Sequence, residues 1–364
     1  MIEKEKCIVL LDCFDFLTYK RKEKLLKHFD NIEKLLDYSF LMQNKVWLLE
    51  NVIDEEEFEV LSQNLNQKSF ELIEKNFEKL NIFVITIFSS DYPEKLKNID
   101  TPPFVLYCRG NKSLLLEKSI SIVGTRHITN YGKLVTEKFA KALSDVGFVI
   151  VSGLACGVDT IAHTTTIENN GKTIAVLAGG LHEIYPKSNT VLAKQIVEKQ
   201  GLIISETRPY KKTESYMFPI RNRIISALSE GVLITEAQEK SGVIHTKNYA
   251  LEYGKDVFAI PGNIFSLYSL GTNRMISNGQ AKAVLTPEDI LEEYQISINK
   301  IKKEKSNYTP EENNIIDILK TGEKTFQELV FATKYEVKTL NSLLTSLVIR
   351  GIIKKLAGNV YFLI

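Results

Sequence analysis

The chain has 364 residues, which is enough for two or three domains. Hydrophobic residues make up 44% and charged residues 25%, a composition that is typical of soluble globular proteins and excludes a fibrous or wholly disordered chain. The 46 basic and 45 acidic side chains nearly cancel, which excludes nucleic-acid binding through the charge of the whole protein, so any such site must be a local patch.

The sequence gives no indication of export, membrane insertion or metal binding. No apolar stretch approaches the roughly 18 residues that span a bilayer, and the first residues, MIEKEKCIVLLDCF, mix acids with lysines and lack a small-residue cleavage site. The four cysteines form no CxxC pair and the five histidines are scattered, which argues against disulfides and a zinc module. We therefore expect a cytoplasmic protein with no membrane contact, no metal and no cofactor.

Residues 1–85 contain no glycine or proline and show helical spacing of apolar side chains, as in KLLKHFDNIEKLL at positions 24–36. This pattern predicts a small N-terminal helical domain. Sixteen of the 19 glycines follow between Gly110 and Gly279, so the composition changes along the chain. We place a domain boundary at residues 85/86.

Residues 86–295 alternate short β-branched runs with amphipathic stretches, which predicts parallel βαβ units in a doubly wound, mostly parallel sheet of the extended Rossmann-like α/β class. In such a sheet the ligand crevice lies at the carboxyl ends of the strands. The expected strands are 119–123, 148–152, 173–177, 202–205, 232–235 and 256–260, and expected helices include 132–146, 189–199 and 244–253.

Two of the predicted strands run into glycine loops. The first is followed by Gly124, Thr125 and Arg126, and the second by a loop that holds Ser152, Gly153 and Gly157. Glycine lets backbone N–H groups approach a ligand, and arginine offers a planar fork for phosphate. Both loops are equally well explained as ordinary βα turns. Neither is the GxGxxG fingerprint of a dinucleotide site, so NAD or FAD is not expected.

Residues 208–223 carry five basic groups and one acid, with three aromatic side chains interleaved. Cations that follow phosphates, beside aromatic faces for bases, are the composition of a single-strand site, although a solvated loop is the alternative. The candidates in this segment are Phe218, Arg221, Asn222 and Arg223, and the later strand end adds Lys240, Ser241 and Gly242. For Glu236 we favour an N-cap or salt-bridge role over acid catalysis.

The C-terminal part divides into two segments. Residues 296–308 are polar and rich in lysine, which predicts a linker. In residues 309–364 a Thr309-Pro310 helix start opens three helical patterns, and two strands follow around a Gly358-Asn359 turn. Three helices and a β-hairpin predict a winged helix.

Six motifs, in order over about residues 85–290, resemble the DprA/Smf family. They include VGTR at 123–126, VSGLACGVDTIAH at 151–163, FPIRNRIIS at 218–226, TEA at 235–237 with KSG at 240–242, and FAIPG at 258–262. The resemblance implies a Rossmann-like protein without catalytic residues that binds single-stranded DNA, forms homodimers and loads the RecA recombinase during natural transformation. The DNA-binding residues that we expect are Gly124, Thr125, Arg126, Ser152, Gly153, Gly157, Phe218, Arg221, Asn222, Arg223, Lys240, Ser241 and Gly242.

The sequence departs from the family pattern in places. Cys156 stands where the family usually has arginine, and residues 1–85 resemble the family's helical module, SAM-like or degenerate helix-hairpin-helix, but lack the glycines of a helix-hairpin-helix. We therefore expect residues 1–85 to mediate interactions rather than bind DNA.

Two alternative functions remain open. One is a nucleotide-processing Rossmann enzyme of the phosphoribohydrolase type, for which Thr235-Glu236 is present without the full glycine motif. The other is a regulator that binds duplex DNA through helix 337–350, which offers only Lys338 and Arg350 as cations.

Overall fold

The computed structural model describes residues 1–296, 308–356 and 358–363. These residues form two compact units, Met1–Ile298 and Asn299–Ile364. No helix among the described residues is long and apolar enough to cross a membrane. The predicted linker, residues 296–308, lies almost entirely outside the described residues.

The N-terminal segment is helical, as the spacing predicts. Its elements are α1 (Glu3–Asp12), α2 (Tyr19–His28), η1 (Ile32–Leu36), α3 (Tyr38–Gln43), α4 (Lys45–Asn51), α5 (Glu55–Asn64) and α6 (Gln67–Lys79). Asp54 caps α5 in a capping box with Glu57, and the side chain of Asn66 caps α6.

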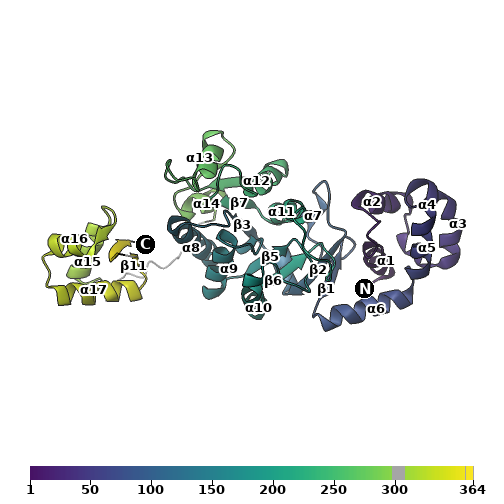
Figure 1. Cartoon of the computed structure of the whole chain (residues 1–364), viewed down its shortest axis with the longest axis horizontal. Helices are drawn as coiled ribbons and strands as arrows, with labels where there is room; N and C mark the ends of the chain where they lie inside the picture. Colours follow the sequence, from purple (N-terminus) through teal and green to yellow (C-terminus); the bar gives the residue numbers. More distant parts are fainter. Residues whose placement is uncertain (297–307, 357, 364) are drawn as a thin grey trace. The chain divides into compact units, whose positions relative to one another are not determined.

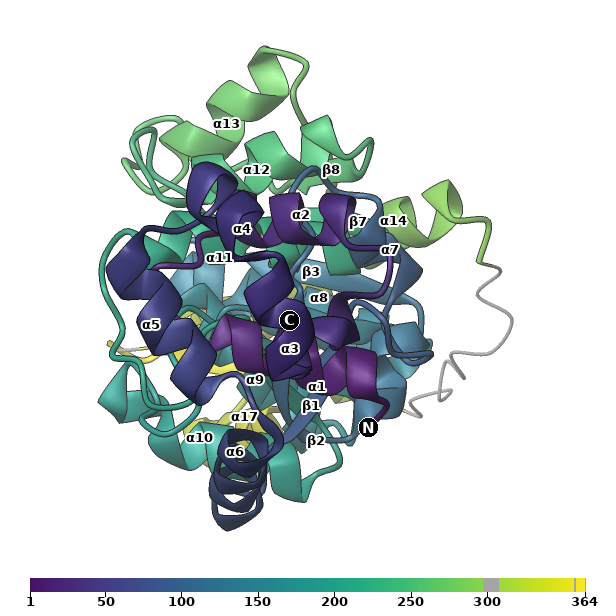
Figure 2. The same ribbon diagram turned by 90° about the vertical axis from the view of Figure 1, so that its right-hand side faces the viewer.

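These helices share a hydrophobic core with one end of the sheet. The buried residues of α1 belong to the same cluster as Phe104 and Tyr107, and the Tyr107 hydroxyl donates a hydrogen bond to Asp12 at 2.8 Å. Figures 1 and 2 show the helices against the β1–β2 end of the sheet. Strand β1 begins at Phe83, so it crosses the boundary that we place at residue 85, and that boundary stays a prediction.

The sheet has the strand order β1-β2-β6-β5-β4-β3-β7-β8-β9. Neighbouring strands are parallel except for β1–β2 and β2–β6, so the predicted mostly parallel α/β sheet is confirmed. The strands are β1 (Phe83–Thr86), β2 (Val105–Gly110), β3 (Ser119–Val123), β4 (Val149–Ser152), β5 (Thr173–Leu177), β6 (Leu202–Ser205), β7 (Gly231–Ile234), β8 (Asp256–Ala259) and β9 (Lys282–Ala283).

Helices cover both faces of this sheet. Side chains of α8, α9 and α14 pack on one face, whereas α11 and α12 pack on the other. The elements between the strands are α7 (Glu94–Lys97), η2 (Lys112–Leu116), α8 (Asn130–Asp145), α9 (Val158–Glu168), η3 (Lys187–Asn189), α10 (Thr190–Glu198), α11 (Met217–Leu228), α12 (Val243–Glu252), α13 (Leu270–Ser277) and α14 (Pro287–Glu293). From β3 the chain continues to β4, β5 and β6 on one side, while β7 and β8 lie on the other, so β3 and β7 flank the switch point.

The C-terminal unit contains the predicted three helices and hairpin. Its elements are α15 (Pro310–Leu319), β10 (Lys324–Thr325), α16 (Phe326–Thr333), α17 (Val337–Ile349), β11 (Ile353–Leu356) and β12 (Val360–Leu363). Thr309 caps α15 as predicted. Gly358 and Asn359 have φ of 80° and 56°, as a tight hairpin turn requires. The interpretation as a winged helix stays a prediction.

Candidate nucleic-acid interface

A cavity of about 570 Å³ lies at the carboxyl ends of β3 and β7, at the switch point. We call this cavity the crevice. The loops that follow the two strands are joined, because the Thr125 N–H donates to the Glu236 carbonyl at 2.7 Å. Nine of the thirteen expected DNA-binding residues line the crevice: Gly124, Thr125, Arg126, Phe218, Arg221, Asn222, Lys240, Ser241 and Gly242.

Glycines allow the loop after β3 to pack against the loop after β4, which leads into α9. Gly157 has a φ of +81°, and a Cβ there would lie 2.2 Å from the Thr125 carbonyl oxygen. A Cβ on Gly124 would lie 2.5 Å from the side chain of Val158, at the start of α9. A larger residue at either position would separate the two loops. The glycines therefore set the shape of the crevice floor.

The exposed cations of the crevice are Arg126 and Lys240. The guanidinium carbon of Arg126 lies 5.0 Å from the centroid of the Phe218 ring, and the Tyr185 ring lies 5.7 Å from the same ring. Within the part of the chain that the structure describes, no carboxylate lies within ion-pair distance of Arg126 or Lys240. Both cations and two aromatic faces are thus available to a ligand.

Arg221 lines the crevice but is only 7% exposed. Its Nη1 donates to the carbonyl of Gly153 at 2.8 Å and to that of Val176 in β5. A Cβ on Gly153 would lie 2.5 Å from the guanidinium, so this glycine makes room for the arginine. Burial lowers the pKa of Arg221 to about 10, although the nearby Asp159 raises it. Arg221 therefore positions the loops after β4 and β5 more than it offers a free charge.

Asp159 completes this buried network. Its Oδ2 accepts the N–H groups of Gly153 at 3.0 Å and Ala155 at 3.2 Å. Burial raises the pKa of the carboxyl, against the charge of Arg221 and these hydrogen bonds. The network fixes the loop that leads into α9.

Four expected residues do not line the crevice: Ser152, Gly153, Gly157 and Arg223. Ser152 is fully buried, and its hydroxyl donates to the Ile122 carbonyl at 2.6 Å. Arg223 is buried as well, and its Nη2 donates to both oxygens of Glu206 at 2.7 Å. The Ser152 hydroxyl and the Arg223 Nη2 are thus engaged inside the protein, whereas the Arg223 Nη1 is buried without a hydrogen-bond partner among the described residues. Neither side chain lines the crevice, and their assignment to DNA stays a prediction.

The basic segment 208–223 is partly neutralised by the N-terminal helices. Arg208 and Lys211 both pair with Asp15, which follows α1. The sequence alone cannot indicate this pairing, because nearly two hundred residues separate the partners. Sequence reasoning also missed Tyr185, which lines the crevice after β5. The strand-end argument, applied to β5 as well, would have found this tyrosine.

Three helices begin at the crevice. Its lining includes Asp159 in the first turn of α9, Phe218 in that of α11 and Val243 in that of α12. The N-terminus of a helix favours an anion through its partial positive charge and through N–H groups that lack an acceptor. At the starts of α11 and α12 the N–H groups already have acceptors, since Phe218 donates to the Ser215 carbonyl and Ile244 to the Ser241 carbonyl, so among the described residues only the start of α9 offers such donors. The crevice thus combines the start of α9, two exposed cations and aromatic rings.

Glu236 and His163, two groups that could serve an enzyme, are both buried. Glu236 is 1% exposed, and its oxygens accept from the N–H and the hydroxyl of Thr129, the N-cap of α8, at 2.9 and 2.6 Å. Glu236 is therefore not itself an N-cap, because it follows β7 while Gly242 is the N-cap of α12, and it has no ion pair among the described residues. It instead holds the residue that caps α8. His163 is fully buried, and burial lowers its pKa to about 3. Among the described residues no cluster of three or more metal-ligating side chains occurs.

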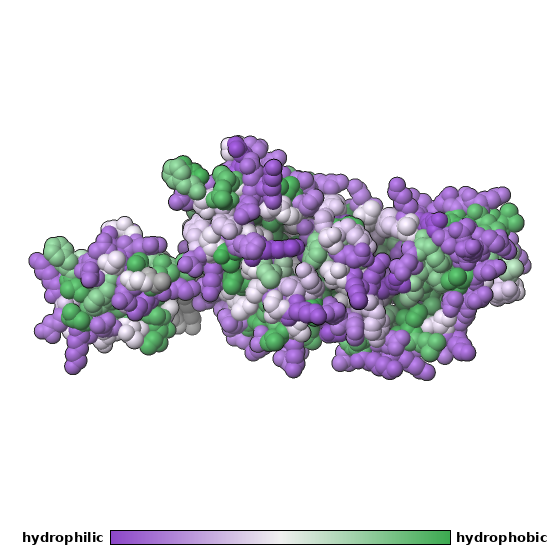
Figure 3. Space-filling view, viewed as in Figure 1, coloured by the Kyte–Doolittle hydropathy of each residue, from purple (hydrophilic) through white to green (hydrophobic). Residues whose placement is uncertain are grey.

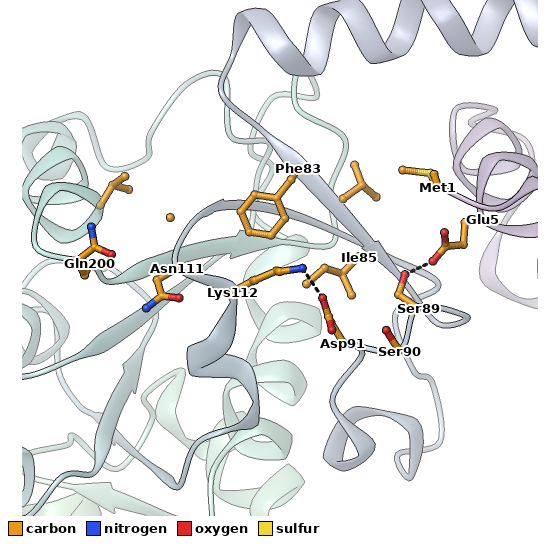
Figure 4. A pocket seen from close by; sticks show the side chains of 13 residues that line it. Met1, Glu5, Phe83, Ile85, Ser89, Ser90, Asp91, Asn111, Lys112 and Gln200 are labelled. Carbon is orange, nitrogen blue, oxygen red and sulfur yellow. Dashed lines mark hydrogen bonds and ion pairs between the residues drawn. The ribbon is translucent and has the colours of Figure 1, made fainter.

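A larger cavity of about 790 Å³ lies beside edge strand β1 and contains none of the expected residues. Figure 4 shows that Lys112 there is paired with Asp91, and that Ser89 is hydrogen-bonded to Glu5. Its one lysine is therefore engaged, and the cavity lacks the glycine loops and aromatic pair of the crevice.

A doubly wound sheet with a crevice at its switch point defines an α/β protein of the Rossmann-like class. Residues 83–295 match the model of the family described as DNA recombination-mediator protein A. The chain belongs to this family, the DprA/Smf family of the sequence resemblance.

Relatives and solved structures agree with this assignment. The DNA processing protein DprA of Bacillus subtilis (strain 168) is 45% identical over 218 residues, which are 60% of this chain and 73% of that protein. That of Streptococcus pneumoniae R6 is 40% identical over 223 residues, 61% and 77% of the two chains.

Two solved structures resemble the fold. The X-ray structure of DprA from Streptococcus pneumoniae has a TM-score of 0.64 at 32% identity, and the match covers 80% of this chain and 98% of that one. DNA processing protein A from Helicobacter pylori, described for its single-stranded DNA binding mode, has a TM-score of 0.54 at 32% identity, with 59% and 95% covered.

Proposed function

We propose that the chain binds single-stranded DNA in the crevice at the carboxyl ends of β3 and β7. The observation that carries this proposal is the pairing of an exposed cation with an aromatic face, Arg126 over Phe218 at 5.0 Å, at the start of α11. Cations neutralise phosphates, and aromatic rings stack on bases. The single-stranded DNA binding mode described for the Helicobacter pylori protein supports the same ligand class.

We further propose that the bound strand is handed to the RecA recombinase in natural transformation, in the cytoplasm. The family description, recombination-mediator protein, supports a role in recombination. The role that we propose is that of a loader and not of a catalyst, and the burial of the Glu236 carboxylate and of the His163 imidazole supports it. Release of base from nucleoside monophosphates would instead support the phosphoribohydrolase alternative.

A homodimer is part of this proposal. Between β8 and α13 the apolar side chains of Ile264, Phe265 and Leu267 are 72%, 89% and 67% exposed. Figure 3 shows apolar atoms at the surface in the region of α13. A second copy that covered them would remove apolar area from water. Phe265→Glu should therefore shift the protein from dimer to monomer in light scattering, and a dimer of unchanged stability would exclude this surface.

The experiment that tests the main proposal compares fluorescence anisotropy of labelled single-stranded and duplex oligonucleotides. We expect tight binding of the single strand only. Strand exchange by RecA on DNA coated with single-strand-binding protein should also accelerate when the protein is added. Equal affinity for duplex, or cleavage of the DNA, would contradict the proposed function.

A further inference from the structure

A second cavity of about 620 Å³ lies between β2, β6 and α10, on the other side of residues 182–187 from the crevice. We call it the Arg109 pocket. Its basic lining residues are Arg109 on β2, His182, Lys187 and Lys194, and its acidic ones are Glu183 and Glu198. None of the expected DNA-binding residues belongs to this pocket.

Arg109 is the unusual residue of this pocket. Its side chain is half-buried, and its Nε is shielded from solvent without a hydrogen-bond acceptor. Its one hydrogen bond among the described residues is from Nη2 to the Leu181 carbonyl, at 3.3 Å, and no carboxylate pairs with it there. Burial lowers the pKa of this guanidinium. A buried donor without a partner is costly, and an anion with two acceptor oxygens would satisfy the planar fork.

The rim adds cations that can reach the same anion. Lys187 pairs with Glu183 at 3.0 Å and Lys194 with Glu198 at 3.6 Å, and in each pair the partners are four residues apart along the chain. These ion pairs are exposed to solvent and therefore contribute little to the stability of the protein. Either lysine can thus leave its glutamate and pair with another anion. The two glutamates repel an anion at the rim, which places the preferred position at Arg109, on the pocket floor.

The Arg109 pocket and the crevice are neighbours. His182, Glu183, Ile184 and Lys187 line the Arg109 pocket, whereas Tyr185, between them in sequence, lines the crevice and contacts Phe218. A strand whose bases stack on Phe218 and Tyr185 would therefore contact this segment at Tyr185. We propose that the Arg109 pocket binds a backbone phosphate of the same single strand, beyond the nucleotides in the crevice. This inference rests on the proposed function and adds to it a second phosphate subsite that sets the length of DNA required.

The test is a length series. Binding of oligodeoxythymidines from about 4 to about 16 nucleotides, the range typical of single-strand sites, is measured for the wild type and for Arg109→Gln. The variant should match the wild type on the shortest strands and bind the longest about tenfold more weakly. Lys194→Gln, a change at the solvent-exposed rim that leaves the sheet intact, should show a smaller loss with the same length dependence. Lys141→Gln, an exposed lysine of α8 outside both cavities, is the matched control and should change nothing.

The results of the length series distinguish the phosphate subsite from the alternatives. Equal affinities at every length, or an equal loss at every length for both Arg109→Gln and Lys194→Gln, would overturn the inference while single-strand binding itself stands. If inorganic phosphate binds through Arg109 in calorimetry but the series shows no length-dependent loss, the pocket takes a free anion, and the inference is also wrong. If the wild type binds no strand of any length, the proposed function fails first.

Discussion

Replacing Arg126 with alanine removes one of the two exposed cations of the crevice and tests its contribution to DNA binding. The side chain is exposed, and its interaction among the described residues is with the Phe218 ring, so its loss removes only a surface cation–π contact. Such contacts contribute roughly 0.5–1 kcal/mol, so the free energy of unfolding should fall by no more than this amount. A charge-assisted hydrogen bond to phosphate contributes about 1.5 kcal/mol, which corresponds to about tenfold in affinity.

The assay for Arg126→Ala is anisotropy titration of a labelled oligonucleotide at several salt concentrations. Loss of one phosphate contact should reduce the slope of log K against log salt by about 0.7 for a single strand. Lys138→Ala, an exposed lysine of α8 that does not line the crevice, controls for the change in net charge. Unchanged affinity and unchanged slope in Arg126→Ala would refute the assignment of this arginine to phosphate.

Three other variants test the surrounding network. Arg221→Ala should destabilise the protein by about 3 kcal/mol in chemical denaturation, because it leaves buried carbonyls and the Asp159 carboxylate without their cation; weakened DNA binding with unchanged stability would instead make Arg221 a direct ligand contact. Asp15→Asn should release Lys211 and strengthen single-strand binding, with a salt slope steeper by about 0.7, and an unchanged slope would contradict this role. Burial lowers the pKa of His163 to about 3 from the ordinary 6.5, so the unfolded state binds one more proton between these values, and stability is lost as pH falls below about 6.5. His163→Asn should lower that pH dependence by one proton, and an identical pH profile would show that His163 titrates equally in the folded and unfolded states.

Much of the sheet could be predicted from the sequence. The six predicted strands correspond to β3–β8 within one residue at each end, because a fully buried parallel strand is a continuous β-branched run. The strands that were missed are β1, β2 and β9, which lie toward the edges of the sheet. Strands β1 and β9 are the edge strands and bury less surface, so their sequences carry a weaker pattern, whereas residues 105–108 of β2 are buried. Strand β2 is also antiparallel to its neighbours, and its residues precede the first βαβ unit.

The site was predicted less completely, and Arg221 and Arg223 show why. Both belong to α11, where successive residues turn by about 100°, so side chains two positions apart point about 200° apart. They cannot both face the crevice. Arg221 turns toward the loop at Gly153, and Arg223 turns to Glu206. The helical period could be read from the sequence. The pairing of Arg223 with Glu206, which follows β6, could be recognised only once the fold was known.

Under the proposed function, the number of solvent-accessible cations, and not the formal net charge, determines how strongly the affinity for DNA depends on salt. Of the three Arg and Lys side chains that line the crevice, Arg221 is buried in backbone contacts, which leaves Arg126 and Lys240. Two phosphate contacts at about 0.7 each give a salt slope of only about 1.4 for strands that fill the crevice alone. Most of the affinity for such strands must then come from terms that salt does not screen, namely stacking on Phe218 and Tyr185 and hydrogen bonds from the start of α9. Under the proposed function, a chain with 46 basic and 45 acidic groups would hold single-stranded DNA without an overall positive charge.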